Sequence, residues 1–150
     1  MNNNQRVQRI LLDTSFLLPT LGVEVEHEVM EVIPRLNHEE VQLFYSHWSL
    51  LESSWFATKQ IKQDTYQKTR FRRGLLSITK TGHYNAVSTG PDDYMIALDL
   101  FQMGHSDMID NLLYATALRN QQQFLTIDTE FSKFVAKNEI EDVLLFPKEL

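Results

Sequence analysis

The sequence predicts an α/β protein built around a central, mostly parallel sheet, and three observations lead to this prediction. Short apolar runs of strand length alternate along the chain with longer segments of helical periodicity, an order that produces parallel strands flanked by helices. Two of these apolar runs end in an aspartate. The 150 residues, 43% of them hydrophobic, suffice for one proper core, so we expect residues 1–150 to form a single domain.

The first elements follow from apolar periodicity. Residues 7–12 include three uninterrupted aliphatic residues and suit a strand buried on both faces of a parallel sheet. Residues 23–36 place valine, isoleucine and leucine at helical spacing with glutamates between them, which predicts an amphipathic helix. A second strand is expected over residues 41–45.

The middle of the chain is predicted to hold two helices and a loop. Ser46 or Ser49 can cap the first helix. Its apolar side chains are expected to face the core: Leu50, Leu51, Trp55 and Phe56. A basic helix is predicted over residues 65–77, and the polar residues 82–90 are typical of a loop.

The second half continues the alternation. A helix is expected to begin at Gly90-Pro91, where Asp92 and Asp93 complement the positive end of its dipole and need do no more than this. The remaining elements are predicted as a helix over 106–119, a turn over 120–123, a strand over 124–127, a helix over 129–137 and a strand over 143–146.

Composition narrows the functional classes. The chain has no cysteine, which excludes a disulfide framework, a thiolate zinc site and a thiol nucleophile. Its polar N-terminus runs into an apolar stretch too short for a signal peptide or a membrane span. We therefore expect a cytoplasmic protein in a reducing setting, with no membrane partner.

Charge is distributed unevenly. The formal net charge of -6 argues against a protein that coats nucleic acid by bulk electrostatics. Residues 59–83, however, hold seven basic residues and one acidic residue, a local sum of +6, so the rest of the chain carries -12.

Asp13 and Asp128 are the two aspartates that end predicted strands. Ligands of open parallel sheets bind beyond the carboxyl ends of the strands, so both side chains are expected at one edge. If their strands are neighbours, the two carboxylates can approach one cation. For Asp13 taken alone, an N-cap for the turn that follows is the preferred interpretation, and the second strand-end aspartate is what favours a shared site.

Three motifs resemble the PIN-domain family, whose VapC-like members are ribonucleases. Residues 11–18, LLDTSFLL, match the family's first strand, which ends in an aspartate followed by a small residue and then Ser or Asn. Residues 110–117, DNLLYATA, match D-x-x-[IL]-x-A-x-A, and residues 124–131, FLTIDTEF, match a strand ending T-x-D-x-x-F. Glu52 offers the family's helical glutamate in an apolar context. The resemblance spans residues 10–146, although residues 59–90 carry no motif of the family.

The resemblance implies a three-layer α/β/α sandwich and a hydrolytic endoribonuclease that cuts RNA phosphodiester bonds. It implies that Asp13, Glu52, Asp110 and Asp128 are the catalytic and metal-binding residues and hold Mg2+ or Mn2+. The donor set agrees, because hard divalent cations favour carboxylate oxygens. The resemblance also implies an RNA substrate and a homodimer. It leaves open whether the chain is the toxin of a toxin–antitoxin pair, in which case an antitoxin partner is implied, or an RNA-processing enzyme.

Several neighbouring residues have two interpretations. Ser15 and Thr126 can hold the ligand carboxylates by hydrogen bonds, or can be ordinary turn and strand-end hydroxyls. Asp107 and Glu130 are close enough in sequence to join the cluster, but a helix cap for Asp107 and a favourable first-turn charge for Glu130 are preferred. The histidines are scattered singly and are interpreted as polar surface or loop residues.

The basic segment offers an RNA contact. Arg70, Arg72 and Arg73 can grip the phosphate backbone while nearby aromatic side chains stack on bases. A solvated helix face is the commoner outcome for such a run.

Two other functions remain open. A PIN-like domain can bind RNA or a protein without cutting. A phosphatase or phosphoacceptor domain also places an aspartate at the end of its first strand, where Asp13 stands, but this reading is weaker because Ser15 occupies the position of the second aspartate it needs.

Overall fold

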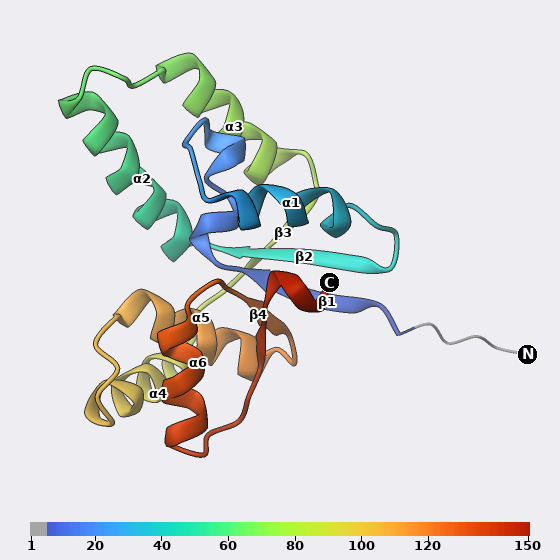
Figure 1. Cartoon of the computed structure of the whole chain (residues 1–150), viewed down its shortest axis with the longest axis vertical. Helices are drawn as coiled ribbons and strands as arrows, with labels where there is room; N and C mark the ends of the chain where they lie inside the picture. Colours follow the sequence, from blue (N-terminus) through green and yellow to red (C-terminus); the bar gives the residue numbers. More distant parts are fainter. Residues whose placement is uncertain (1–5) are drawn as a thin grey trace, which may run out of the picture.

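The computed structural model describes residues 6–150, and its central feature is a sheet of five parallel strands in the order β3-β2-β1-β4-β5 (Figure 1). The strands are β1 (Gln8–Leu12), β2 (Val41–Ser46), β3 (Tyr84–Val87), β4 (Gln123–Leu125) and β5 (Leu144–Leu145). β1 lies at the centre and pairs with both β2 and β4. The two strands that precede Asp13 and Asp128 are therefore neighbours, as the prediction of a shared edge requires.

Helices cover both faces of the sheet, which makes the three-layer α/β/α sandwich predicted for the chain (Figure 1). One layer holds α1 (His27–Leu36), α2 (His47–Lys62) and α3 (Lys68–Lys80), and the other holds α4 (Pro91–Gln102), α5 (Met108–Arg119) and α6 (Thr129–Lys137). Three short 3-10 turns complete the chain: η1 (Thr14–Phe16), η2 (Pro19–Leu21) and η3 (Pro147–Glu149).

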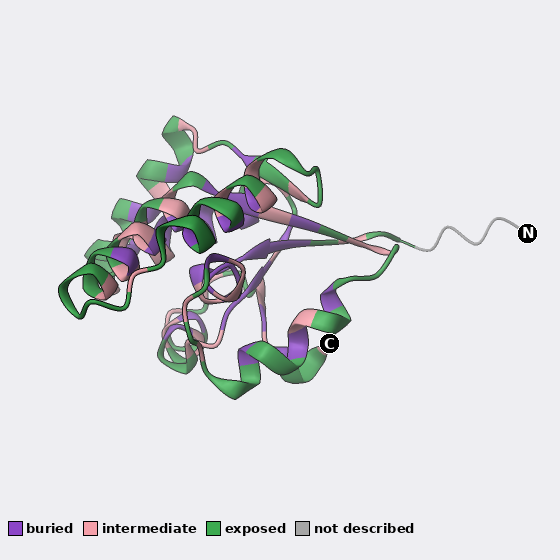
Figure 2. Ribbon diagram, turned by 90° about the horizontal axis from the view of Figure 1, so that it is seen from above, coloured by how far each residue is buried: buried purple, intermediate pink, exposed green. Residues whose placement is uncertain are grey.

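The alternating side chains of β1 divide the core in two. Ile10 and Leu12 face the first helical layer, and Leu11 faces the second. All three are at most 1% exposed, and Figure 2 shows buried residues along the central strands and on the helices that cover them. The uninterrupted aliphatic run thus reflects a strand that is covered on both sides.

The structure corrects one predicted loop and the predicted start of one helix. Residues 82–90 are not only a loop, because β3 forms within them and pairs with β2 from Leu43↔Tyr84 to Ser46↔Val87. The first helix begins at His27 rather than at residue 23, since Gly22 adopts a left-handed conformation (φ 79°) that turns the chain.

The orientation predicted for α2 is also partly wrong. Ser46 caps this helix, its Oγ accepting a hydrogen bond from the Trp48 backbone N–H at 3.2 Å. The buried face consists of Ser49, Ser53 and Ala57, whereas Leu51 is 44% and Trp55 50% exposed. Small side chains on the inner face let the helix lie close to its neighbours, and the large apolar ones remain outside.

The start of α4 carries an ion pair that the sequence does not reveal, in which the aspartate is buried and the arginine is partly exposed. Asp93 is 0% exposed and accepts two hydrogen bonds from the Arg119 guanidinium, at 2.7 and 2.8 Å. Asp93 therefore does more than complement the helix dipole: it joins α4 to the end of α5.

No helix among residues 6–150 is long and apolar enough to cross a membrane.

Candidate active site

Two aspartates stand at the carboxyl edge of the sheet, where β1 and β4 lie side by side. Asp13 follows β1 and caps η1, its Oδ1 accepting from the Thr14 N–H at 2.7 Å. Its second oxygen accepts from Thr126 Oγ1 at 3.0 Å. Asp128 caps α6 and accepts from the Phe131 N–H at 3.1 Å. Asp13 can therefore cap η1 and still stand beside the second strand-end carboxylate, Asp128.

Two further carboxylates approach this edge from helices. Asp110 lies in the first turn of α5, and Glu52 lies in α2, the helix that follows β2. Asp107 caps α5 by accepting hydrogen bonds from the Ile109 and Asp110 N–H groups at 3.0 and 3.1 Å, which is the role preferred for it from the sequence.

Electrostatics show that these groups crowd one another. Burial, and then the like charges of Glu52 and Asp128, raise the pKa of Asp13 from 3.8 to about 7. Burial followed by repulsion from Asp13, Asp107, Asp128 and Glu52 raises the pKa of Asp110 to about 9. Burial and the charge of Asp107 also raise the pKa of Glu52. The four predicted ligands therefore lie close enough at this edge of the sheet to perturb one another's charge, and we call them the acidic cluster.

The donor set fits a divalent cation. Within residues 6–150, none of the four carboxylates forms an ion pair with Lys or Arg. Oxygen ligands that are unpaired, partly buried and mutually repulsive are what Mg2+ or Mn2+ would bind and neutralise.

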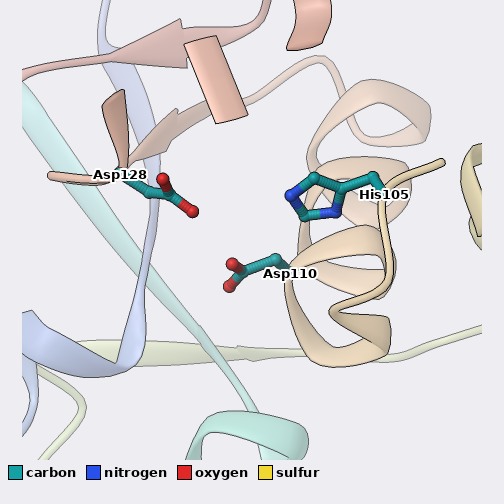
Figure 3. A group of neighbouring side chains, drawn as sticks. All are labelled: His105, Asp110 and Asp128. Atoms are coloured by element: carbon teal, nitrogen blue, oxygen red, sulfur yellow. The ribbon is translucent and has the colours of Figure 1, made fainter. Parts of the chain in front are cut away.

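His105 is a member of this neighbourhood that sequence reasoning missed. Ligand atoms of His105, Asp110 and Asp128 all lie within 4.8 Å of one another. Figure 3 shows the Asp110 and Asp128 carboxylates directed into the same space with the His105 ring beside them. His105 lies in a loop as expected, but it is half-buried and stacks on Phe131 (centroids 4.4 Å apart) rather than standing on a polar surface. No periodicity could have revealed it, because its position depends on the packing of α6 against the loop before α5.

Other predicted residues lie away from the four carboxylates or make different contacts. Thr126 has the expected contact with Asp13, but Ser15 donates no side-chain hydrogen bond in the described part of the chain and instead lines a groove beside Leu18 and Val25. Glu130 is exposed and pairs with Lys133 at 2.9 Å, in line with its exclusion from the cluster.

The three arginines predicted to contact RNA lie on α3, which packs against η2 and β3. Arg72 and Arg73 are exposed. Arg70 is exposed as well, and its Nη2 donates to the Pro19 carbonyl at 3.4 Å. These residues are thus carried on a helix distinct from those that supply the carboxylates.

A family model described as "PIN domain" matches residues 10–137 of the chain. Solved structures with the same fold include a toxin–antitoxin complex from Klebsiella pneumoniae (20% identity, TM-score 0.58, covering 94% of this chain and 99% of that one). VapBC2 from Rickettsia felis bound to a promoter DNA fragment has 13% identity and a TM-score of 0.62, covering 93% and 98%. VapC20 from Mycobacterium tuberculosis, a toxin that cleaves the sarcin–ricin loop, has 17% identity and a TM-score of 0.58, covering 83% and 93%. No curated protein matches the chain.

Proposed function

The chain belongs to the PIN-domain family, and on this premise we propose that it is a metal-dependent endoribonuclease whose acidic cluster holds Mg2+ or Mn2+. Asp13, Glu52, Asp110 and Asp128 are the proposed metal ligands and catalytic residues. The observation that carries this proposal is the concentration of four carboxylates from separate elements, with the pKa of Asp13 raised to about 7 and that of Asp110 to about 9. Such mutual repulsion is costly unless a cation offsets it.

Residues around the cluster prepare it for hydrolysis. A bound divalent cation would lower the pKa of a water molecule, orient the scissile phosphate and neutralise charge in the transition state. Thr126 fixes the orientation of Asp13, and the cap to α6 fixes that of Asp128. Without a cation, Asp110 keeps its proton at neutral pH, so binding should release protons. No protein nucleophile is required.

The test is RNA cleavage by the full chain with EDTA, Mg2+ or Mn2+, using an Asp13→Asn variant. Asparagine can still cap η1, so this variant should fold while losing a ligand. We expect cleavage only with a divalent cation, and loss of cleavage by at least about a hundredfold in the variant. The matched control is Asp99→Asn, on the exposed face of α4. Cleavage that persists in EDTA would refute the proposal.

Two outcomes would support other functions. Calorimetry that detects no Mg2+ or Mn2+ binding would favour a PIN-like module that binds RNA or protein without cutting. An acid-stable aspartyl-phosphate trapped on Asp13 would favour the phosphoacceptor reading.

RNA is the proposed substrate, and α3 is the proposed contact with its backbone. The exposed Arg72 and Arg73 project from a helix without an acidic residue. Replacing both with Gln should weaken RNA binding and reduce its salt dependence while leaving Mn2+ affinity unchanged. An unchanged salt dependence would contradict this role.

An antitoxin is a proposed partner, supported by the likeness to structures of toxin–antitoxin complexes. A groove between η2, α1 and α3 offers a surface of mixed character, with the apolar Val23, Val25 and Met30 beside the charged Glu24 and Arg70. If an adjacent open reading frame encodes a small DNA-binding protein with a disordered tail, the two proteins should co-purify and the partner should inhibit cleavage.

A homodimer is also proposed, because α4 exposes several large apolar side chains: Tyr94, Met95, Leu98 and Phe101. Light scattering should give twice the chain mass for the wild type and the monomer mass for Leu98→Lys. A monomeric wild type would contradict the proposal.

A further inference from the structure

The loop between α4 and α5 holds an imidazole whose position is determined by its packing. The His105 ring stacks on the Phe131 ring, with centroids 4.4 Å and planes 27° apart. The centroid of the Phe134 ring lies 5.1 Å from that of His105. Phe131 is fully buried in the core beneath α6. The ring therefore has a fixed plane, although it lies on an irregular segment.

Asn111 determines which ring nitrogen of His105 carries a proton. The Asn111 side-chain nitrogen donates to the His105 carbonyl at 2.8 Å and to the Ala97 carbonyl at 3.4 Å. Its oxygen is therefore the atom that faces His105 Nδ1, at 2.6 Å, and a carbonyl oxygen can only accept. Nδ1 is thus the donor, and in the neutral ring the lone pair is on Nε2.

Nε2 faces the acidic cluster. Figure 3 shows the ring nitrogen farther from the backbone pointing to the space between the Asp110 and Asp128 carboxylates. The three ligand atoms lie within 4.8 Å of one another, yet within residues 6–150 no hydrogen bond or ion pair joins the ring to either carboxylate. An octahedral cation with ligand distances of about 2.1 Å places its ligands about 3 to 4.2 Å apart, so only a small contraction would bring all three onto one ion.

We propose that His105 Nε2 is a ligand of the cation held by Asp110 and Asp128, and that this nitrogen makes the site select Mn2+ or a similar first-row transition ion over Mg2+. The inference rests on the proposed metal-dependent function. Its chemical basis is a comparison of the two ions: Mg2+ takes oxygen ligands, whereas a first-row transition ion also accepts an imidazole nitrogen, Mn2+ less strongly than the later ions of the row. The hydrogen bond from Nδ1 to Asn111 is the outer contact that usually orients a metal-binding histidine.

The competing arrangement is an imidazolium, with Nε2 also protonated, which would stand beside the carboxylates as a permanent cation. In that case the ring would repel a metal ion instead of binding it. Both arrangements keep the proton on Nδ1, so the distinction concerns Nε2 alone.

The decisive experiment is pulsed electron paramagnetic resonance of the full chain loaded with Mn2+. A directly coordinated imidazole gives nitrogen modulation of the Mn2+ signal, and we expect it in the wild type. The His105→Phe variant keeps a ring for stacking on Phe131 but lacks the nitrogen, so the modulation should disappear. His83→Phe, at an exposed histidine elsewhere in the chain, is the matched control and should leave the signal unchanged.

Calorimetry provides a second readout that does not depend on activity. His105→Phe should weaken Mn2+ binding at least about tenfold and leave Mg2+ binding nearly unchanged. Equal losses for both ions, or Mn2+ bound to the wild type without nitrogen modulation, would overturn the inference while leaving RNA hydrolysis intact. Failure of the wild type to bind any divalent ion would overturn both proposals. Because the wild-type spectrum is itself decisive, the test does not depend on the variant folding.

Discussion

Replacing Asp110 by asparagine should stabilise the metal-free protein while abolishing metal-dependent cleavage. Asp110 keeps its proton in the folded chain up to about pH 9, whereas in the unfolded chain it ionises near 3.8. The native state therefore binds more protons than the unfolded state between these values, and the free energy of unfolding falls as the pH rises through this window. Asparagine resembles the neutral acid and has no proton to lose.

The magnitude follows from the size of the pKa shift. About four pKa units separate the ordinary value from pH 8, which at about 1.4 kcal/mol each amounts to about 6 kcal/mol. Because Asp110 keeps some contact with solvent, which screens its charge, we expect about half of this, about 3 kcal/mol. The advantage of Asp110→Asn should shrink as the pH falls to about 4 and vanish below the ordinary pKa of 3.8, where both states of the wild type carry the proton.

The assay is urea unfolding followed by circular dichroism in EDTA, at a series of pH values from 4 to 8.5. Asp99→Asn, an exposed aspartate on α4, should show no such pH-dependent gain. Mn2+ at a thousand times its dissociation constant should reverse the order, since it adds about 4.1 kcal/mol to the wild type. An Asp110→Asn protein that is less stable than the wild type at pH 8 in EDTA would refute the reasoning.

Three other substitutions test contacts around the cluster. Thr126→Val removes the hydroxyl that donates to Asp13 and should weaken Mn2+ binding about 10- to 100-fold by calorimetry. Arg119→Leu leaves Asp93 buried without its partner and should lower the free energy of unfolding by about 3 kcal/mol in urea. Gly74→Ala should cost about 1–3 kcal/mol, because a Cβ at this position of α3 would collide with the backbone of η2.

Each of these has its own control. Thr126→Ser keeps a hydroxyl and should bind Mn2+ nearly as the wild type does. The double variant Arg119→Leu with Asp93→Asn should recover much of the lost stability, and no recovery would show that the ion pair is not the cause. Gly90→Ala meets no neighbouring atom within 4 Å, so an equal loss there would contradict the proposed collision at Gly74.

Local patterns predicted the elements that build the edge of the sheet. β1, β4 and α6 follow from apolar runs and from a helix that begins directly after Asp128. Their adjacency could be stated only as a condition, because strand order depends on pairing between residues more than a hundred positions apart, such as Leu12 with Leu125. The family resemblance supplied the further expectation that Asp110 and Glu52 come to the same place.

The errors concern features that depend on distant contacts. β3 was missed because Asn85 and Ala86 are exposed on an edge strand, so no alternation marks it and only its pairing with β2 makes it a strand. The apolar character of Leu51 and Trp55 predicts that they face the core, whereas α2 packs through its small residues and leaves both exposed. His105 was overlooked for a similar reason: its position depends on Phe131, which lies 26 residues farther along the chain.

The central position of β1 has a consequence for biosynthesis. Asp13 is translated more than a hundred residues before the β4 neighbour that brings Asp128 beside it. A nascent chain therefore exposes only an incomplete acidic edge, and the hydrolytic centre proposed here cannot assemble until β4 and Asp128 have left the ribosome. Such an order of synthesis would protect the messenger RNA being read and would leave prematurely terminated products inert.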